Sequence, residues 1–318
     1  MGVLVIVFMK ESDDEGKLKN FCNFVASCSK LSKSTMNLIA VSGSDQTEWA
    51  FVEQDELVDL QKTEGLNPYF QTRREMSRSI RLGLGEAYFK RKLGHVYFYG
   101  AGCNGEDRKK MVGQSLVAQF KTPVTVESDL LGATRSMCMD SAGIVCILGT
   151  GSNSCFYDGA HIVKNVRAGG YILGDEGSAS SIGRAFLSDV LKELAPSDLI
   201  SSFYFQHQTT AHEVMRTVYD KPLPHYYLSS IATFLTDYQH MEYVRDLVTD
   251  NFKLFLTRNL FQYAYHQYPV YFTGKTAVTF APLLRAVCRE AGFEPEMVSD
   301  HVVEGLMKYH ATHLFPDQ

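Results

Sequence analysis

The chain has 318 residues, 45% of them hydrophobic and 21% charged, and a formal net charge of −5, which is the composition of a soluble globular protein long enough for two domains. The acidic balance and the lack of a Lys/Arg stripe argue against a nucleic-acid-binding role, and no apolar run approaches the roughly 20 residues of a membrane span. The seven cysteines are scattered, with no CxxC pair and no zinc-ligand spacing, and this pattern indicates reduced core residues in a cytoplasmic protein.

The first 35 residues differ from the rest of the chain. Residues 3–9 form an apolar run without a basic flank or a small-residue cleavage site, so they do not fit a signal peptide. Residues 10–35 are polar and weakly patterned, and Met36 stands directly before the first clear strand. We therefore predict an N-terminal extension over residues 1–35 and a folded domain that begins at Met36.

Residues 36–141 alternate between strand and helix patterns. Short apolar or alternating runs predict strands, and apolar residues three or four apart predict helices. The predicted elements are strands 37–41, 48–52 and 57–61, helix 72–92, strand 95–99, helix 106–119, strand 124–127 and helix 130–139. This order is typical of an α/β layer with an antiparallel hairpin on a parallel core, and we take 36–141 as the N-terminal domain.

From residue 142 the pattern starts again with a hairpin. The predicted elements are the hairpin 144–157, helix 179–194, a mostly helical stretch to residue 268, strand 270–272, and helices over 278–291 and 303–313. We therefore predict a second α/β domain over 142–302 with a helical insertion. The C-terminal segment 303–318 is predicted to return its helix to the first domain.

Glycine and hydroxyl residues fill the turn of the second hairpin. The turn residues are Gly149, Thr150, Gly151 and Ser152. Glycine lets a ligand approach the backbone, and successive free N–H groups with nearby hydroxyls form an anion-binding nest. A second glycine cluster at residues 169–170 leads to Asp175 and Glu176 at a helix start. An acidic pair there is compatible with helix capping and with binding of sugar hydroxyls, and both remain open.

Eight motifs in chain order carry a resemblance to a known family. They are residues 42–44, 65–68, 99–103, 129–133, 148–154 and 170–178, Gly274 with Ala277, and residues 304–310. On these residues the chain, from Met36 to His310, resembles the N-acetylglucosamine kinase branch of the BadF/BadG/BcrA/BcrD ATPase family, within the actin–hexokinase–Hsp70 superfamily. The resemblance implies two ribonuclease-H-like (actin-like ATPase) domains that face each other across a nucleotide and sugar cleft.

The resemblance also implies a role for each matched site residue. Asp129 would be the general base that accepts the proton of the sugar hydroxyl as it attacks the γ-phosphate of ATP. The implied ATP- and phosphate-binding residues are Gly43, Ser44, Gly149, Thr150, Gly151, Ser152 and Gly274. The implied sugar-binding residues are Asn67, Gly102, Asp129, Gly170 and Asp175. The structural alternatives are a helix cap for Asp129 or Asp175, an Asn-Pro turn for Asn67, and ordinary tight turns for the glycines.

The first phosphate loop departs from these kinases, which read Asp-x-Gly-Ser-Thr-Lys-Thr at this position. Val41 replaces the leading aspartate that helps to hold Mg²⁺, and a valine side chain has no oxygen for a metal ion. Gln46 replaces a cation near the phosphates, and Asp45 adds negative charge where anionic oxygens should approach. We therefore predict either impaired catalysis or a metal ligand that has moved to Asp45.

Three functions follow as hypotheses. The first is an ATP- and Mg²⁺-dependent kinase that makes N-acetylglucosamine 6-phosphate or a close relative. The second is a weakened or inactive homologue that binds a sugar and acts as a regulator. The third is a BadF-like ATPase activator with a shared iron–sulfur cluster, which the match at Asn67, Asp129 and Asp175 disfavours. The expected partner is a small-molecule sugar, with no nucleic acid and no membrane, and the resemblance suggests a homodimer.

Overall fold

The structure is a computed structural model that describes residues 36–313. The predicted N-terminal extension, residues 1–35, lies outside the described residues. Within residues 36–313, no helix is both long enough and apolar enough to cross a membrane. The cysteines in this part of the chain are all buried and free of disulfide bonds: Cys103, Cys138, Cys146, Cys155 and Cys288.

A five-stranded mixed sheet forms the centre of the first lobe (residues 36–138). Its strands are β1 (Met36–Ser42), β2 (Gln46–Glu53), β3 (Glu56–Glu64), β4 (Leu93–Gly100) and β5 (Val124–Ser128). They lie in the order β3-β2-β1-β4-β5, with β1, β4 and β5 parallel and with β2 and β3 antiparallel to their neighbours. This topology confirms the predicted antiparallel hairpin on a parallel core.

The helices of the first lobe follow the prediction except at one point. They are α2 (Arg73–Leu84), α3 (Glu86–Phe89), α4 (Glu106–Phe120) and α5 (Asp129–Cys138). The single helix predicted over residues 72–92 was wrong, because the helix breaks at Gly85, whose φ is 75°. Glycine adopts this left-handed conformation without steric penalty, so it ends α2 and lets the chain turn into α3.

The two faces of the first sheet pack against different helices. Leu38 and Ala40 of β1 belong to the core formed with α2 and α4. Ile39, which lies between them, packs instead with Val303 and Leu306 of α14 (Val302–Thr312). Successive side chains of a strand point to opposite faces, so β1 is buried on both sides. This explains why its sequence is a continuous apolar run.

A second five-stranded sheet forms the centre of the second lobe (residues 143–298). Its strands are β6 (Gly143–Leu148), β7 (Ser152–Tyr157), β8 (Ile162–Val166), β9 (Val270–Thr273) and β10 (Met297–Val298), in the order β10-β9-β6-β7-β8. Strands β8 and β10 were not predicted. Both lie at sheet edges. In β8 the three central residues are exposed, so its pairing with β7 defines the strand and not a buried apolar pattern.

Helices cover the outer face of the second sheet. They are α6 (Gly170–Leu173), α7 (Ala179–Leu191), α8 (Ser197–Gln206), α9 (Ala211–Tyr219), α10 (Pro224–Leu235), α11 (Glu242–Arg258), α12 (Lys275–Thr279) and α13 (Ala281–Glu290), with short 3₁₀ turns η2 (Thr236–Tyr238) and η3 (Leu260–Gln262). Ile144 and Cys146 of β6 share one core with Phe186 of α7 and with Phe252 and Phe255 of α11. The predicted helical insertion is therefore part of the principal core of this lobe.

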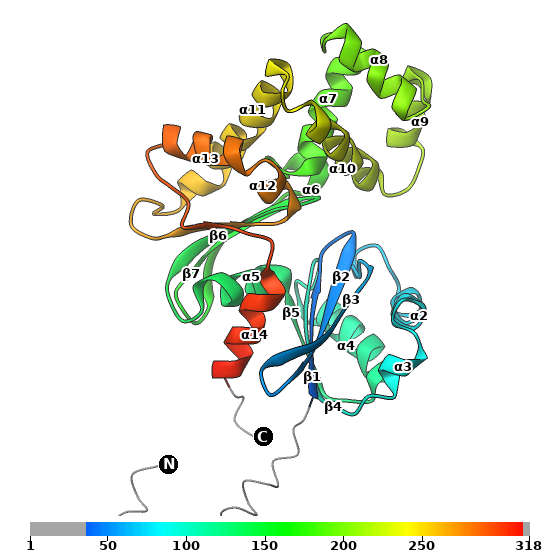
Figure 1. Ribbon diagram of the computed structural model, residues 1–318, viewed down its shortest axis with the longest axis vertical. Coiled ribbons are helices and arrows are strands. Elements are labelled where there is room, and N and C mark those ends of the chain that lie inside the picture. Colours follow the sequence, from blue (N-terminus) through cyan, green and yellow to red (C-terminus); the bar gives the residue numbers. More distant parts are fainter. Residues whose placement is uncertain (1–35, 314–318) are drawn as a thin grey trace, which may run out of the picture.

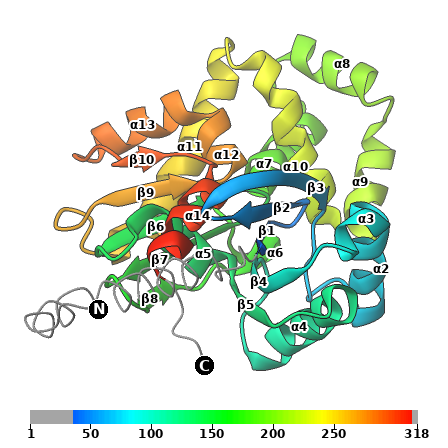
Figure 2. The ribbon, with the colours of Figure 1, turned by 60° about the horizontal axis from the view of Figure 1, so that its bottom comes forward.

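Helices α5 and α14 lie between the two sheets (Figures 1 and 2). Leu130 and Ala133 of α5 pack against Val145 and Tyr157 of the second sheet. Helix α14 packs on α5 and on β1 of the first sheet. The two helices approach closely at Gly305, where a Cβ would collide with Ser136. The first residue of α5, Asp129, is therefore held at the boundary between the lobes. The domain boundaries at 141 and 302 stay predictions.

Candidate active site

Three parallel strands end side by side at one edge of the first sheet. In the strand register, Ser42 of β1 lies opposite Gly100 of β4, and Gly100 lies opposite Ser128 of β5. In open α/β sheets, ligands bind beyond the carboxyl ends of the strands. The segments that leave this edge are the first glycine loop (residues 42–46), the turn that contains Gly102, and Asp129 at the start of α5. The sheet thus brings three predicted site segments together.

The second sheet presents a matching edge. Ile147 near the end of β6 lies opposite Thr273 at the end of β9. The second glycine loop (residues 149–152) follows β6, and Gly274 follows β9 with a φ of 99°. A Cβ on Gly274 would lie 2.5 Å from the carbonyl oxygen of Leu148. Gly274 therefore packs directly under the second glycine loop, where another side chain does not fit.

The second glycine loop is held by hydrogen bonds to its carbonyl groups. The carbonyl oxygen of Gly149 accepts from the amide of Ala179, at 2.9 Å, and from Oγ1 of Thr276, at 2.9 Å. The carbonyl oxygen of Thr150 accepts from the amide and Oγ of Ser180, at 3.2 and 2.6 Å. The starts of α7 and α12 thus fix this loop, and the sequence predicted neither contact.

Asp175 lies against the second glycine loop. Its Oδ1 accepts from the amide of Ser152, at 3.2 Å, and a Cβ on Gly151 would lie 3.0 Å from its Oδ2. The residue is buried, has a φ of 58°, and its pKa is raised to about 6 because burial removes water from the carboxylate. The helix-cap alternative is wrong, since Ser178 caps α7 and accepts from Ser181.

Asp129 begins α5 at the boundary between the lobes. The predicted alternative of a helix N-cap is wrong, because Ser128 is the N-cap and its Oγ accepts from the amide of Leu131 at 3.2 Å. Oδ1 of Asp129 accepts from the amide of Leu130 at 2.8 Å. The side chain is half-buried, and desolvation raises its pKa to about 6. A carboxylate in this state suits proton transfer near neutral pH.

Asn67 and Gly102 are in contact. A Cβ on Gly102 would collide with Oδ1 of Asn67, and Gly102 has a φ of 78°. Oδ1 of Asn67 also accepts from the amide of Tyr69 at 3.0 Å, so the predicted turn role of Asn67 is confirmed. The loop is tied to the first glycine loop, since Ser42 Oγ accepts from the amide of Leu66 at 2.9 Å. By contrast, Gly170 has no neighbour within contact distance of a Cβ.

The substituted residues of the first glycine loop occupy two different environments. Val41 is half-buried and packs with the apolar group that includes Tyr99 and Leu306. Asp45 and Gln46 are both exposed. The apolar surroundings of Val41 explain why a valine is tolerated there, while the two exposed residues set the charge of the loop.

The described residues do not form a metal site by themselves. Within residues 36–313, no group of three or more His, Cys, Asp or Glu side chains is placed to hold a metal ion. In nucleotide sites, Mg²⁺ is usually held by one or two carboxylates together with the phosphates. Asp45 offers one exposed carboxylate. A single carboxylate suits a Mg²⁺ ion that is also held by the phosphates, and not an ion held by the protein alone.

Helix α10 supplies two site neighbours that the sequence did not predict. Oη of Tyr226 donates to the carbonyl oxygen of Ser44 at 2.7 Å, which joins the second lobe to the first glycine loop. The adjacent His225 stacks on Phe70 of the first lobe, with ring centroids 4.7 Å apart. The aromatic run that begins at His225 was the available signal, but only the fold places it beside residues far away in sequence.

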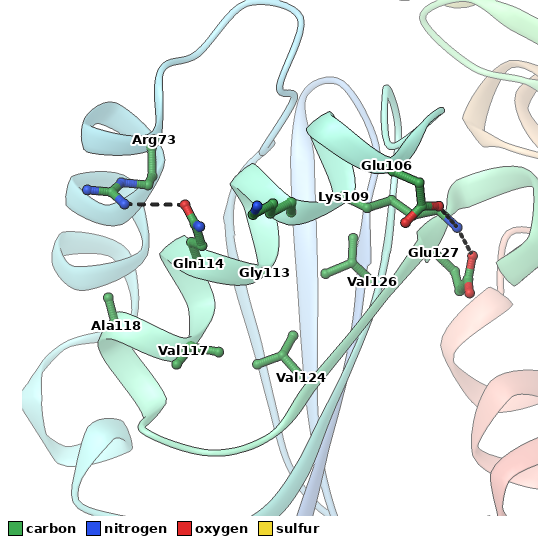
Figure 3. A pocket seen from close by; sticks show the side chains of 11 residues that line it. Arg73, Glu106, Lys109, Gly113, Gln114, Val117, Ala118, Val124, Val126 and Glu127 are labelled. Atoms are coloured by element: carbon green, nitrogen blue, oxygen red, sulfur yellow. Dashed lines mark hydrogen bonds and ion pairs between the residues drawn. The ribbon is translucent and has the colours of Figure 1, made fainter.

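A hollow of about 830 Å³ lies elsewhere, on the outside of the first lobe (Figure 3). It is formed by α4, β5 and the start of α2. Lys109 pairs there with Glu127 at 2.6 Å, and Arg73 donates to Gln114 at 3.3 Å. None of the predicted site residues lines it. The hollow is therefore separate from the two glycine loops.

Solved structures with the same fold identify the relatives of the chain. The crystal structure of a putative N-acetylglucosamine kinase from Porphyromonas gingivalis is 35% identical, covers 87% of this chain and 99% of its own, and has a TM-score of 0.82. A protein of the same description from Chromobacterium violaceum is 15% identical over 87% of this chain and 99% of its own, with a TM-score of 0.66. A ROK family glucokinase from Streptomyces griseus, in complex with glucose and AMPPNP, is 13% identical over 86% of this chain and 97% of its own, with a TM-score of 0.53.

The two less similar structures show the fold alone, and the first shows the family. No protein-family model and no curated protein matches the chain. The shared fold confirms the predicted pair of actin-like ATPase lobes. Because more than a third of the residues are identical over almost the whole of the Porphyromonas gingivalis protein, this chain belongs to the family of N-acetylglucosamine kinase-like sugar kinases.

Proposed function

We propose that the chain is an ATP-dependent amino-sugar kinase that transfers the γ-phosphate of ATP to the 6-hydroxyl of N-acetylglucosamine. The observation that carries this proposal is Asp129, a half-buried carboxylate with a raised pKa at the boundary between the two lobes. Asp129 follows the carboxyl end of β5, at the same sheet edge from which the first glycine loop leaves, and its helix packs against the second sheet. This location supports a base that acts between a sugar and a nucleotide. The family relationship to a protein described as an N-acetylglucosamine kinase supports the choice of sugar.

In the proposed reaction, Asp129 takes the proton of the attacking hydroxyl. The sugar oxygen forms a bond to the γ-phosphorus, and the bond from that phosphorus to the oxygen of the β-phosphate breaks, which releases ADP. Phosphoryl transfer depends mainly on positioning and on charge stabilisation, so a carboxylate is an adequate base. A pKa of about 6 leaves most of Asp129 ionised at neutral pH and ready to accept the proton.

The nucleotide would bind along the second glycine loop and Gly274. The carbonyls of Gly149 and Thr150 are engaged by α7 and α12, and the amides of Gly149 and Ser152 donate within the protein. The proposed donors for phosphate oxygens are therefore the amides of Thr150 and Gly151 and the hydroxyls of Thr150 and Ser152. The proposed phosphate-binding residues of the first lobe are Gly43 and Ser44, with Asp45 as ligand for the Mg²⁺ that neutralises phosphate charge. The proposed sugar residues are Asn67, Gly102, Gly170 and Asp175.

A second candidate function is favoured by the first glycine loop. Valine at position 41 removes a metal-binding acid, the exposed amide at 46 removes a cation, and the exposed acid at 45 adds negative charge near the phosphates. A homologue with such a loop would bind the sugar and turn it over slowly or not at all, and would then act as a sugar-dependent regulator.

A coupled ADP-release assay distinguishes the two functions. We would measure turnover with a panel of hexoses and N-acetylated amino sugars, and use Asp129→Asn as the blank. The kinase proposal predicts turnover that is highest with N-acetylglucosamine and lost in the variant. Sugar binding by calorimetry without turnover would support the regulator. Neither binding nor turnover with any sugar would refute both.

A further inference from the structure

His225 is a buried polar side chain for which the proposed reaction has no role. It is 6% exposed, and neither Nδ1 nor Nε2 has a hydrogen-bond partner within residues 36–313. Burial lowers the pKa of the ring, so the imidazole is neutral at pH 7 and carries one donor and one acceptor. Buried groups of this kind are normally paired, because an unpaired donor or acceptor loses stability.

The neighbours of the imidazole are aromatic rings. Phe70 and Tyr171 stack on it, with centroid distances of 4.7 and 5.6 Å and interplanar angles of 28° in both cases. Tyr226 lies beside it at 4.3 Å. Stacking engages the faces of an imidazole, whereas its donor and acceptor lie in the plane of the ring. The aromatic contacts therefore hold the ring in place and leave both nitrogens unused.

The segments around His225 are those assigned to the sugar and the phosphates. Phe70 follows Asn67 by three residues, and Tyr171 directly follows Gly170. Oγ of Ser180 donates both to the carbonyl oxygen of His225, at 3.2 Å, and to that of Thr150 in the second glycine loop, at 2.6 Å. The start of α10 thus lies beside both sugar segments and is linked to a phosphate loop.

The cover over the imidazole comes from both lobes. Phe70 belongs to the first lobe and is 45% exposed, whereas His225 and Tyr171 belong to the second lobe. A hinge movement that separates the lobes, as in other kinases that close on their substrates, would lift Phe70 from the ring. A ligand held by the segments that carry Asn67 and Gly170 would then reach the imidazole.

We propose that His225 is a specificity-determining residue whose ring nitrogens hydrogen-bond a hydroxyl or acetamido group of the sugar when the lobes open to admit it. The proposal rests on the proposed sugar kinase function. A site that pairs a buried polar group with its substrate discriminates strongly against analogues that lack the matching group. In this proposal, a bound sugar supplies the hydrogen-bond partners that the two ring nitrogens lack in the present structure.

The test compares His225→Phe with the wild-type protein. Phenylalanine keeps a ring for Phe70 and Tyr171 but removes both nitrogens. We expect the KM for N-acetylglucosamine to rise by about 10-fold or more, with kcat and the KM for ATP within about threefold, because a lost binding contact raises KM alone. The melting temperature should stay the same or rise. His225→Asn, which retains a donor and an acceptor, should recover part of the affinity.

The control is His207→Phe. His207 is a half-buried histidine of the second lobe, and its ring lies against Phe203 and Phe234, away from both sugar segments. This variant should keep the wild-type KM for the sugar. A comparison of glucose with N-acetylglucosamine identifies the group recognised, since a larger loss with the latter assigns the acetamido group and an equal loss assigns a hydroxyl.

Two results would overturn the proposal. An unchanged KM for every sugar in His225→Phe would show that the nitrogens do not contact the substrate. A raised KM together with a lowered melting temperature and no recovery in His225→Asn would show a purely structural role. A wild-type protein that neither binds nor phosphorylates any sugar would refute the kinase function itself, and this outcome is seen without any variant.

Discussion

The first and second glycine loops occupy equivalent positions in the two sheets, yet they are maintained differently. The second loop is fixed through its own carbonyl groups by α7 and α12, and Asp175 lies against it. The first loop also has bonded carbonyl groups, since Gly65 donates to Asp45 at 3.0 Å and Tyr226 to Ser44 at 2.7 Å, but it is held in addition from beneath by Ser42, whose Oγ contacts Thr47 at 2.8 Å and Leu66 at 2.9 Å. None of these contacts uses the side chain of residue 41, 45 or 46.

In the first loop, the residues that hold the backbone are not the residues that set the charge. Ser42 and Thr47 are fully buried and keep the backbone of the first loop in place. Asp45 and Gln46 are exposed and can change without disturbing those contacts. A loop with this shape but without these charges is compatible with a nucleotide held mainly by the second loop.

The largest expected effect comes from Asp129, which belongs to neither loop. We expect Asp129→Asn to lower kcat by about 10³-fold, within the range of about 10²–10⁴ for general bases. For the wild type, kcat/KM should fall as the pH drops below about 6, because the pKa of Asp129 is near 6 and only the ionised form accepts a proton. The measurement is a pH profile of ADP release. A profile that is flat from pH 5 to 8 would contradict the role of Asp129 as the base.

The next largest effect concerns how tightly the backbone is packed at the two loops. Gly274→Ala places a Cβ 2.5 Å from a carbonyl oxygen at a φ of 99°, and we expect a loss of about 2–4 kcal/mol in the free energy of unfolding. Gly43→Ala is the matched variant, since the nearest atom to its Cβ would be 3.7 Å away. It should unfold like the wild type in urea. Equal losses in both variants would show that the loops are packed alike.

A third prediction concerns the stability cost of Asp175 in the second loop. Its pKa is raised from 3.8 to about 6, so the unfolded chain releases this proton at lower pH than the folded chain. Stability is therefore lost as the pH rises from about 4 to about 6 and stays lower above that range. We expect Asp175→Asn to be more stable than the wild type at pH 7 by on the order of 1–3 kcal/mol. Urea unfolding at pH 4 and pH 7 measures the difference, and a pH-independent difference would contradict the assignment.

A fourth prediction restores the charges of the first loop. We expect Val41→Asp combined with Gln46→Lys to tighten Mg²⁺-ATP binding by about 10-fold, which is the scale of one charge-assisted contact. Gln54→Lys is the control for the lysine. It adds the same single positive charge as Gln46→Lys, but in the exposed β2–β3 turn at the far end of β2. Titration with ATP and Mg²⁺ measures the affinity. If the wild type binds as tightly as the double variant, the first loop is not impaired.

The smallest effect should come from the bond between the lobes at the first loop. Tyr226→Phe removes the hydroxyl that donates to the carbonyl oxygen of Ser44, and we expect a loss of about 0.5–1.5 kcal/mol. Tyr227→Phe, the neighbouring half-buried tyrosine on α10, is the control. A loss of stability confined to Tyr226→Phe would show that this contact joins the lobes, and equal losses would show a general effect of tyrosine removal.

Much of the fold could be predicted from the sequence because its pattern is local. The buried strands β1 and β6 are continuous apolar runs, and the glycine turns that follow them mark where each sheet presents its edge. The helix predicted over residues 72–92 was wrong because the sequence does not say which glycine ends a helix. Gly83 lies within α2, whereas Gly85 takes a positive φ and breaks it. Strand β8 was missed because its exposed residues carry no apolar alternation.

The sequence by itself determined the two-sheet fold, the glycine loops and the acidic residues at positions 129 and 175, since each depends on residue type and short-range spacing. Only the three-dimensional structure showed that neither acid caps its helix, that Asp175 lies on the second loop, and that His225 and Tyr226 meet residues of the other lobe. The caps are local, but Asp175 and Ser152 are 23 residues apart, and His225 and Tyr226 meet residues more than 150 positions away. Such contacts depend on how the sheets and helices pack, which no local pattern records.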